Sequence, residues 1–270
     1  MLSLLLAASL IAAQPETAEQ SHATEPKNLL VNPSFEEPVA PQAQPVNPHV
    51  IGQWWSFAGP EKPYWRHFEV ADDEAADGEK SVRLTLDSEG YDGATLIVGA
   101  TQNVITDTMP TELSGFVRVD DWERGTLRQY AQVVVIVWNV TANKPRTVAA
   151  KNYQIAYTFA GIEQPPFAIA NRKFLFPRGE LVDLQGQDGN PIEGEWKRFD
   201  LNPREDFKKQ WGVDPSDFEY IRVLYEVRYD GRQANQEPPA HAVVHWDDLY
   251  FGERREKETE AQDEIGRAHV

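Results

Sequence analysis

The stretch Glu219–Tyr229 (EYIRVLYEVRY) alternates apolar and polar residues along its length. Its odd-numbered positions from 221 to 229 are apolar, and its even-numbered positions include Arg222, Glu226 and Arg228. A period of two places these two sets on opposite sides of an extended chain. The stretch therefore predicts a β-strand that buries one face and presents charged groups on the other.

The same period recurs on both sides of this stretch. Ser81–Asp87, Leu113–Asp120 and Ala242–Phe251 alternate in the same way. Gln129–Asn139 is almost continuously apolar, which is typical of a central strand that is covered on both faces. Further strands are expected at Asn28–Phe35, Tyr64–Val70, Leu96–Ile105, Arg146–Phe159, Arg172–Phe176 and Glu195–Leu201.

One short helix is expected between two of these strands. Asn202 suits the N-cap, Pro203 suits the first helical position, and Gly212 is able to end the helix. Many short strands and one helix in a connection predict an all-β fold, an antiparallel β-sandwich of the jelly-roll kind.

The composition excludes several classes of function. The chain has 270 residues with 26 Lys and Arg against 43 Asp and Glu, a net charge of −17. Such a chain repels phosphate, so nucleic acid and anionic membrane surfaces are poor partners. The absence of cysteine excludes disulfides, cysteine-bound zinc, iron–sulfur clusters and thiol catalysis.

The two ends are expected to lie outside the folded module. Residues 1–13 (MLSLLLAASLIAA) are apolar and suit a signal peptide, which predicts a secreted, periplasmic or cell-surface protein with no membrane insertion after cleavage. Residues 14–27 are polar and are expected to form a linker. Residues 253–264 are charged, a tail or a linker into a further domain, and residues 265–270 resemble part of a translated sequencing adapter. The folded module is expected at residues 28–252.

Three segments spread over that module carry a resemblance to a known family. They are Asn28–Glu36 (NLLVNPSFE), Asp77–Leu84 (DGEKSVRL) and Val244–Gly252 (VHWDDLYFG). Their order and spacing resemble the galactose-binding-like jelly rolls of the carbohydrate-binding module superfamily, which includes cellulose-, xylan- and laminarin-binding modules. The chain departs from the pattern in the long stretch Ala142–Gly194 and in the added helix.

The resemblance implies a structural calcium ion that joins the start of the chain to its last strand. Carried over by position, its ligands are the Glu36 carboxylate, Asp77 or the main-chain carbonyl of Lys80, and the carboxylate of Asp247 rather than Asp248. Carboxylates and loop carbonyls are the oxygen ligands that calcium prefers. The alternative is that these acids are exposed residues at strand ends.

Aromatic residues are candidates for sugar contact, because flat rings stack on the apolar faces of pyranoses. Trp54, Trp55 and Trp65 lie close to the proline-rich segment Pro38–Pro48 in the sequence. One of the adjacent pair is expected to fill the core, and we favour Trp55 as the exposed one. Trp122 lies in a charged stretch and is expected to be exposed, whereas Trp138 ends an apolar strand and is expected in the core.

Among the predicted strands, Glu219–Tyr229 is the best candidate for ligand binding, through its charged face. Tyr130 and Gln132 on a neighbouring strand are expected to join that face. A cross-strand ladder of salt bridges is the alternative interpretation of that face. The complete predicted set of ligand-binding residues is Trp55, Trp65, Trp122, Tyr130, Gln132, Arg222, Glu226 and Arg228.

The sequence carries no recognisable catalytic motif. His67, His241 and His245 are the only histidines worth considering as bases, and His245 shares a strand face with Asp247. The predicted function is a secreted, non-catalytic and monomeric polysaccharide-binding module, either free-standing or an accessory part of a longer glycan-active protein. Its basic residues favour an anionic glycan. The alternatives are an extracellular adhesive domain that makes protein contacts, and a jelly-roll glycoside hydrolase or polysaccharide lyase.

Overall fold

The computed structural model describes residues 26–39, 51–138, 152–162, 171–177, 184, 190–212, 214–215 and 218–255. The predicted signal peptide, residues 14–25 of the predicted linker, most of the proline-rich segment, and the chain after residue 255 lie outside the described residues.

Strands dominate the described chain. They are β1 (Trp65–Arg66), β2 (Glu69–Ala71), β3 (Ser81–Asp87), β4 (Thr95–Val104), β5 (Glu112–Glu123), β6 (Arg128–Trp138), β7 (Gln154–Ile162), β8 (Arg172–Leu175), β9 (Lys197–Leu201), β10 (Tyr220–Asp230) and β11 (His241–Gly252). The helix α1 (Pro203–Trp211) connects β9 to β10. No helix within the described residues is long and apolar enough to span a membrane.

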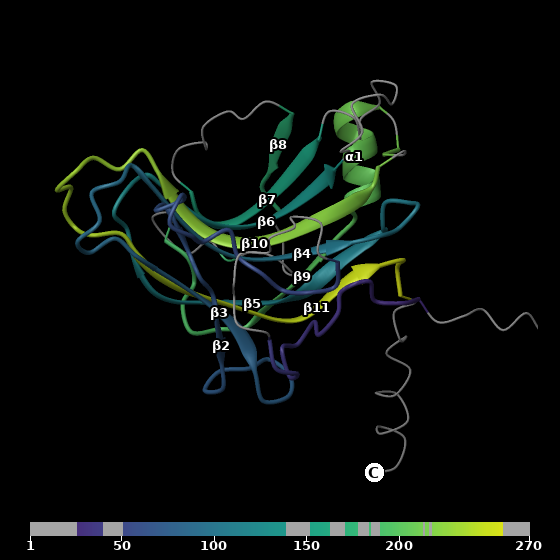
Figure 1. Ribbon diagram of the computed structural model, residues 1–270, viewed down its shortest axis with the longest axis horizontal. Helices are drawn as coiled ribbons and strands as arrows, with labels where there is room; N and C mark the ends of the chain where they lie inside the picture. Colours follow the sequence, from purple (N-terminus) through teal and green to yellow (C-terminus); the bar gives the residue numbers. More distant parts are fainter. Residues whose placement is uncertain are drawn as a thin grey trace, which may run out of the picture.

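The strands form two sheets that pack face to face (Figure 1). One sheet has six strands in the order β1-β4-β10-β6-β7-β8, and the other has five in the order β2-β3-β11-β5-β9. Most neighbours are antiparallel, but the two outermost pairs of the six-stranded sheet, β1–β4 and β7–β8, are parallel. The predicted all-β sandwich with one helix in a connection is confirmed. The predicted strand Tyr64–Val70 is divided into β1 and β2, which join different sheets.

The alternation along β10 places the core. Its odd-numbered residues from Ile221 to Tyr229 are fully buried between the sheets. At the centre, the ring of Tyr225 lies 5.2 Å from that of Trp246 on β11, and Phe159 and Phe199 contact the same indole. Burying a large apolar side chain contributes about 1.5–3 kcal/mol, so this face holds the two sheets together. The even-numbered residues of β10 point to the other side of the six-stranded sheet, which we call the outer face.

The segment Asn28–Phe35 is not a strand, contrary to the prediction. Its Asn32 takes a left-handed φ of 50°, which interrupts an extended chain. The side chain of Asn28 instead joins the segment to β11: its amide donates to the carbonyl of Leu249 at 2.8 Å, and its Oδ1 accepts from the N–H of Phe251 at 3.1 Å. The chain start therefore lies beside the last strand, as the resemblance implied, but without forming a strand.

Helix α1 begins and ends as the sequence predicts. The Asn202 side chain accepts a hydrogen bond from the N–H of Glu205 at 3.1 Å, and Gly212 ends the helix at a left-handed φ of 76°. The hydroxyl of Tyr157 on β7 donates to the Asp206 carboxylate at 2.9 Å. This bond and the buried Phe207 fix α1 to one end of the sandwich (Figure 1).

A short charged segment, Glu253–Arg255, follows β11 and stays in contact with the fold. Arg255 pairs with the buried carboxylate of Glu112 on β5 at 2.8 Å, and Arg254 pairs with Asp200 on β9, also at 2.8 Å. Burial alone would raise the pKa of Glu112, but the guanidinium and backbone N–H of Arg255 hold it below its ordinary value. The segment therefore anchors the chain where it leaves the last strand.

This ion pair predicts a pH dependence of stability. Because the pKa of Glu112 is lowered on folding, its contribution is complete above the unfolded value of about 4.5 and is lost as the pH falls through the folded value. Glu112→Gln is expected to cost about 1–2 kcal/mol at pH 7, since Arg255 is half-exposed. Urea unfolding of both proteins at pH 7 and pH 3 checks this, and an equal difference at the two pH values would contradict it.

Candidate functional site

The outer face of the six-stranded sheet brings together all of the predicted ligand-binding residues except Trp122. The register places Glu226 of β10 opposite Gln132 of β6, and Arg228 opposite Tyr130. Trp65 lies on β1 at the edge of the same sheet. Side chains chosen from separate stretches of sequence therefore meet on one surface because strand alternation and pairing direct them there.

The polar groups of this face form one connected network. We call Gln132, Thr158, Glu226, Arg228 and Asp230 the polar row. The Gln132 amide donates to the Glu226 carboxylate and accepts from the Thr158 hydroxyl at 3.2 Å. Arg228 binds Asp230 with two hydrogen bonds, at 2.6 and 3.1 Å, and lies 3.6 Å from Glu226. Arg228 pairs with both carboxylates of its own strand, so these ion pairs run along β10 and not across strands as the ladder interpretation has it.

Electrostatics in the polar row follow from burial. Burial alone would lower the pKa of Arg228, but the Glu226 and Asp230 carboxylates raise it above the ordinary arginine value. Burial also raises the pKa of Tyr130, whose hydroxyl donates to Asp230. Arg228 therefore stays charged and Tyr130 stays neutral at any physiological pH.

Aromatic rings surround the guanidinium of Arg222 at the neighbouring position of the outer face. The guanidinium carbon lies 5.0 Å from the ring centre of Trp55, 5.2 Å from Phe57 and 5.1 Å from Trp138. Its Nε donates to the Asn103 side chain at 2.9 Å. Cation–π contacts of this kind stabilise a cation that is removed from water. We call Trp55, Phe57 and Trp138 the aromatic wall, and Arg222 is a fixed positive charge within it.

An apolar patch lies on the outer face between the polar row and this wall. It consists of Val134, Ile136, Ala156 and Leu224, all buried. The half-buried rings of Trp65, Trp138 and Phe174 pack around it. The outer face therefore combines flat aromatic surfaces with planar amide, carboxylate and guanidinium groups.

The adjacent tryptophans divide as predicted, but the predicted exposure of Trp55 is wrong. Trp54 enters the core, where its ring lies 4.9 Å from that of Phe35. Trp55 points to the outer face, yet only 5% of it is exposed, because Phe57 packs on it at 4.5 Å and Arg222 faces it. Trp55 is therefore part of the wall and does not form an open platform.

Trp122 and Trp138 exchange the places that the sequence predicts for them. Trp122 is buried in the core, because the register of β5 against β11 shifts next to it and Asp121 takes a left-handed φ of 47°. Such a bulge changes the direction of the following side chain. Trp138 points to the outer face, where it stacks on Tyr220 at 5.9 Å.

Several residues of the outer face are not among the ligand-binding residues predicted from the sequence. Asp230 continues the alternation of β10 by one step beyond Arg228, so the period of two contained that signal. Thr158 is brought to Gln132 only by the pairing of β6 with β7, which includes a register shift. The other missed residues are Phe57, Thr101, Asn103, Arg172, Phe174 and Tyr220.

The carboxylates of Glu36 and Asp247, two of the predicted calcium ligands, accept hydrogen bonds from main-chain N–H groups of the turn between β2 and β3. The Asp247 carboxylate accepts from the N–H groups of Ala76 and Asp77 at 2.7 and 3.0 Å. Its other oxygen accepts from the N–H of Asp248 at 2.7 Å. Oε1 of Glu36 accepts from two N–H groups of the turn, at 2.8 and 2.9 Å. The two carboxylates thus hold the turn directly.

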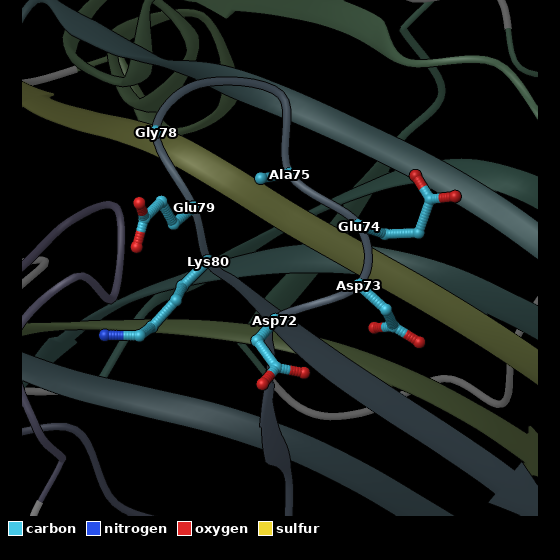
Figure 2. Close-up of a pocket in the computed structure, with 7 residues that line it drawn as sticks. All are labelled: Asp72, Asp73, Glu74, Ala75, Gly78, Glu79 and Lys80. Carbon is cyan, nitrogen blue, oxygen red and sulfur yellow. The ribbon is translucent and has the colours of Figure 1, made fainter.

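These hydrogen bonds engage both carboxylate oxygens of Asp247 and Oε1 of Glu36. Within the described part of the chain, no three histidine, aspartate or glutamate side chains lie close enough to hold a metal. The acidic loop and the turn line a hollow, where Glu74 points away from Asp72 and Asp73 (Figure 2). Asp73 is paired with Arg83, and Glu74 lies 2.9 Å from Arg118. Calcium needs six to eight oxygen ligands. Its binding here stays a prediction of the resemblance.

Removing the Asp247 carboxylate is expected to weaken the fold. Asp247→Ala leaves N–H groups of the turn and of Asp248 without their acceptor, at an expected cost of about 2–4 kcal/mol. Thermal unfolding of the variant and the wild type checks this. An Asp247→Ala variant that melts at the wild-type temperature would contradict it.

His245 lies on the far side of the molecule, on the outer surface of the five-stranded sheet. It is buried, its Nδ1 lies 3.1 Å from the Ser81 hydroxyl, and its Nε2 lies 3.9 Å from the carboxylate of Asp120. Burial and the nearby Arg83 lower its pKa to about 4. His245 is therefore neutral at pH 7 and has a structural place between strands.

With this geometry in view, the chain was compared with known proteins. No family model matches it, and no curated protein matches its sequence. Solved structures match it in fold. TmCBM61, solved in complex with β-1,4-galactotriose, shares 14% identity at a TM-score of 0.37, covering 85% of this chain and 99% of that one.

Two further structures are similar to a comparable extent. A putative sugar-binding protein from Bacteroides thetaiotaomicron VPI-5482 shares 10% identity at a TM-score of 0.43, covering 84% of this chain and 100% of that one. The CBM22-1 xylan-binding domain of Paenibacillus barcinonensis Xyn10C shares 13% identity at a TM-score of 0.40, covering 85% of this chain and 96% of that one. The likeness concerns the fold alone, which the two sheets establish independently.

Proposed function

We propose that this chain is a secreted, non-catalytic polysaccharide-binding module that holds its ligand on the outer face of the six-stranded sheet. The observation that supports this most is the set of half-buried rings of Trp65, Trp138 and Phe174 around the apolar patch, beside the polar row. Export is supported by the apolar segment at residues 1–13. The module would act alone or as an accessory part of a larger glycan-active protein.

The chemistry of the outer face suits a sugar chain. A pyranose has apolar C–H faces that stack on aromatic rings, and hydroxyl groups at its rim that need planar hydrogen-bonding partners. The polar row and Arg222 place amide, carboxylate and guanidinium groups next to the rings. Arg228 is the partly accessible member of this set, and the others are buried. The adhesive alternative, in which the partner is a protein, gives no comparable role to a buried polar network of this kind.

The two carboxylates of the face are poor candidates for catalysis. Glycosidases need one carboxyl as an acid and a second as a nucleophile or base. Glu226 and Asp230 are buried and both pair with the same guanidinium, that of Arg228. Neither is placed to give up or take a proton independently, so the geometry supports binding without turnover.

Affinity electrophoresis of the whole chain tests the proposal. We expect retardation in gels that contain a polysaccharide from a panel of galactan, xylan, laminarin, alginate and polygalacturonate. The same polymers are incubated with the protein and assayed for new reducing ends or unsaturated products, and none is expected. Retardation by no polymer would overturn the binding proposal, and product release would show an enzyme instead.

A further inference from the structure

Arg172 is the charged residue of the outer face that the proposed function has not yet used. It begins the edge strand β8, where Gln154 of β7 lies opposite. Its Nε donates to the Gln154 side chain at 2.9 Å, and its guanidinium carbon lies 5.9 Å from the ring centre of Phe174. These contacts direct the guanidinium over the sheet.

Its electrostatic surroundings support the same placement. Burial lowers the pKa of Arg172, and the charge of Glu226 in the polar row acts in the opposite direction. Arg172 is half-buried, and its charge lies within range of the polar row. A partly desolvated cation is stabilised by a partner of opposite charge or by several acceptors.

Buried donors without a described partner occur on this face as well as elsewhere in the molecule. Nη1 of Arg172 is buried and has no hydrogen-bond partner among the described residues. The indole Nε1 atoms of Trp55 and Trp138 are in the same state. All three atoms are donors only, so the partner that each of them lacks is an acceptor.

The acceptors of the face are already engaged. Glu226 accepts from Gln132 and pairs with Arg228, and Asp230 accepts from Tyr130 and Arg228. Two carboxylates and three guanidinium groups, those of Arg172, Arg222 and Arg228, thus lie among these residues of the face, although the whole chain carries −17.

We propose that the outer face recognises an acidic polysaccharide, and that Arg172 binds the carboxylate of one of its uronic acid residues. A carboxylate is planar and has two acceptor oxygens, which match the parallel N–H groups of a guanidinium. The sugar ring of that residue would lie against the aromatic rings around the apolar patch. This inference rests on the proposed function and names the substrate class of the same face.

Matched polymers test the charge requirement directly. Titration calorimetry of the whole chain compares polygalacturonate with its carboxyl-reduced form, in which each carboxylate becomes a hydroxymethyl group. We expect the reduced polymer to bind at least about 10-fold more weakly. Binding of polygalacturonate should also weaken as sodium chloride is raised, because salt screens the ion pair. Alginate serves as a second uronate polymer, and dextran sulfate as a polyanion without carboxylates.

A variant pair tests the residue. Arg172→Gln is expected to weaken uronate binding about 10- to 100-fold. Lys173→Gln is the control, because it removes one positive charge from the same strand. Lys173 is exposed and lies beside Ile155 on the opposite side of the strand. The Lys173→Gln variant should therefore bind uronate as the wild type does. Melting temperatures of both variants show whether the fold is kept, and the polymer comparison needs no variant at all.

The outcomes separate the two proposals. Equal binding of the reduced polymer, tighter binding of dextran sulfate than of either uronate polymer, or unchanged binding by a folded Arg172→Gln variant would overturn the uronate inference. Binding to a neutral glycan in those cases would leave the proposed function intact. Binding to no polysaccharide would overturn both.

Discussion

Replacing Arg228 with methionine is expected to lower the free energy of unfolding by about 3–5 kcal/mol. The guanidinium lies between two carboxylates, 2.6 Å from Asp230 and 3.6 Å from Glu226, and both of these acids are buried. Methionine fills a similar volume but leaves two negative charges without compensation in a region of low dielectric. Urea unfolding of the variant and the wild type at pH 7 measures the difference.

Glu226→Gln is the matched control for that variant. It removes one charge of the same network, but Arg228 keeps Asp230 as its partner, and the new amide still reaches Gln132. We therefore expect a cost of about 1 kcal/mol. If Arg228→Met cost no more than Glu226→Gln, the polar row would not depend on the central guanidinium.

Replacing Trp138 with alanine is expected to reduce the affinity for polysaccharide by about 2 kcal/mol, roughly 30-fold. The indole is half-buried, stacks on Tyr220 with an angle of 16° between the rings, and borders the apolar patch. It is the ring of the outer face that combines an accessible surface with an unpaired buried N–H. Titration calorimetry with the polysaccharide that the wild type binds best gives the measurement.

Trp196→Ala provides the control for this loss. Trp196 is also half-buried, but it lies on the other side of the sandwich, with its ring 6.2 Å from that of His245. Affinity should not change in this variant. A similar loss of affinity in both variants would show that binding depends on general stability and not on the outer face.

The period of two in the sequence was sufficient to predict the sandwich and most of the outer face. Arg222, Glu226 and Arg228 share a face because alternation within a single strand decides it. Trp54 and Trp55 point to opposite sides for the same reason. Local patterns of this kind need no knowledge of the partners of a strand.

The remaining features depend on contacts between distant parts of the chain. Trp122 enters the core because a bulge at Asp121 changes the phase of β5, and the alternation along that strand contains no sign of it. Arg172 reaches the face only because β8 pairs with β7 in parallel. The depth at which Trp55 is buried depends on the ring of Phe57, which lies on an irregular segment.

Hydroxyl-radical footprinting of the tryptophans, with and without bound polysaccharide, tests the central claim most directly. It reports the solvent accessibility of each ring in one experiment on the unmodified chain. If the outer face binds the ligand, oxidation of Trp65 and Trp138 should fall on binding, while Trp196 on the opposite sheet should be unaffected. Protection of Trp196 with no change at Trp65 and Trp138 would contradict the account.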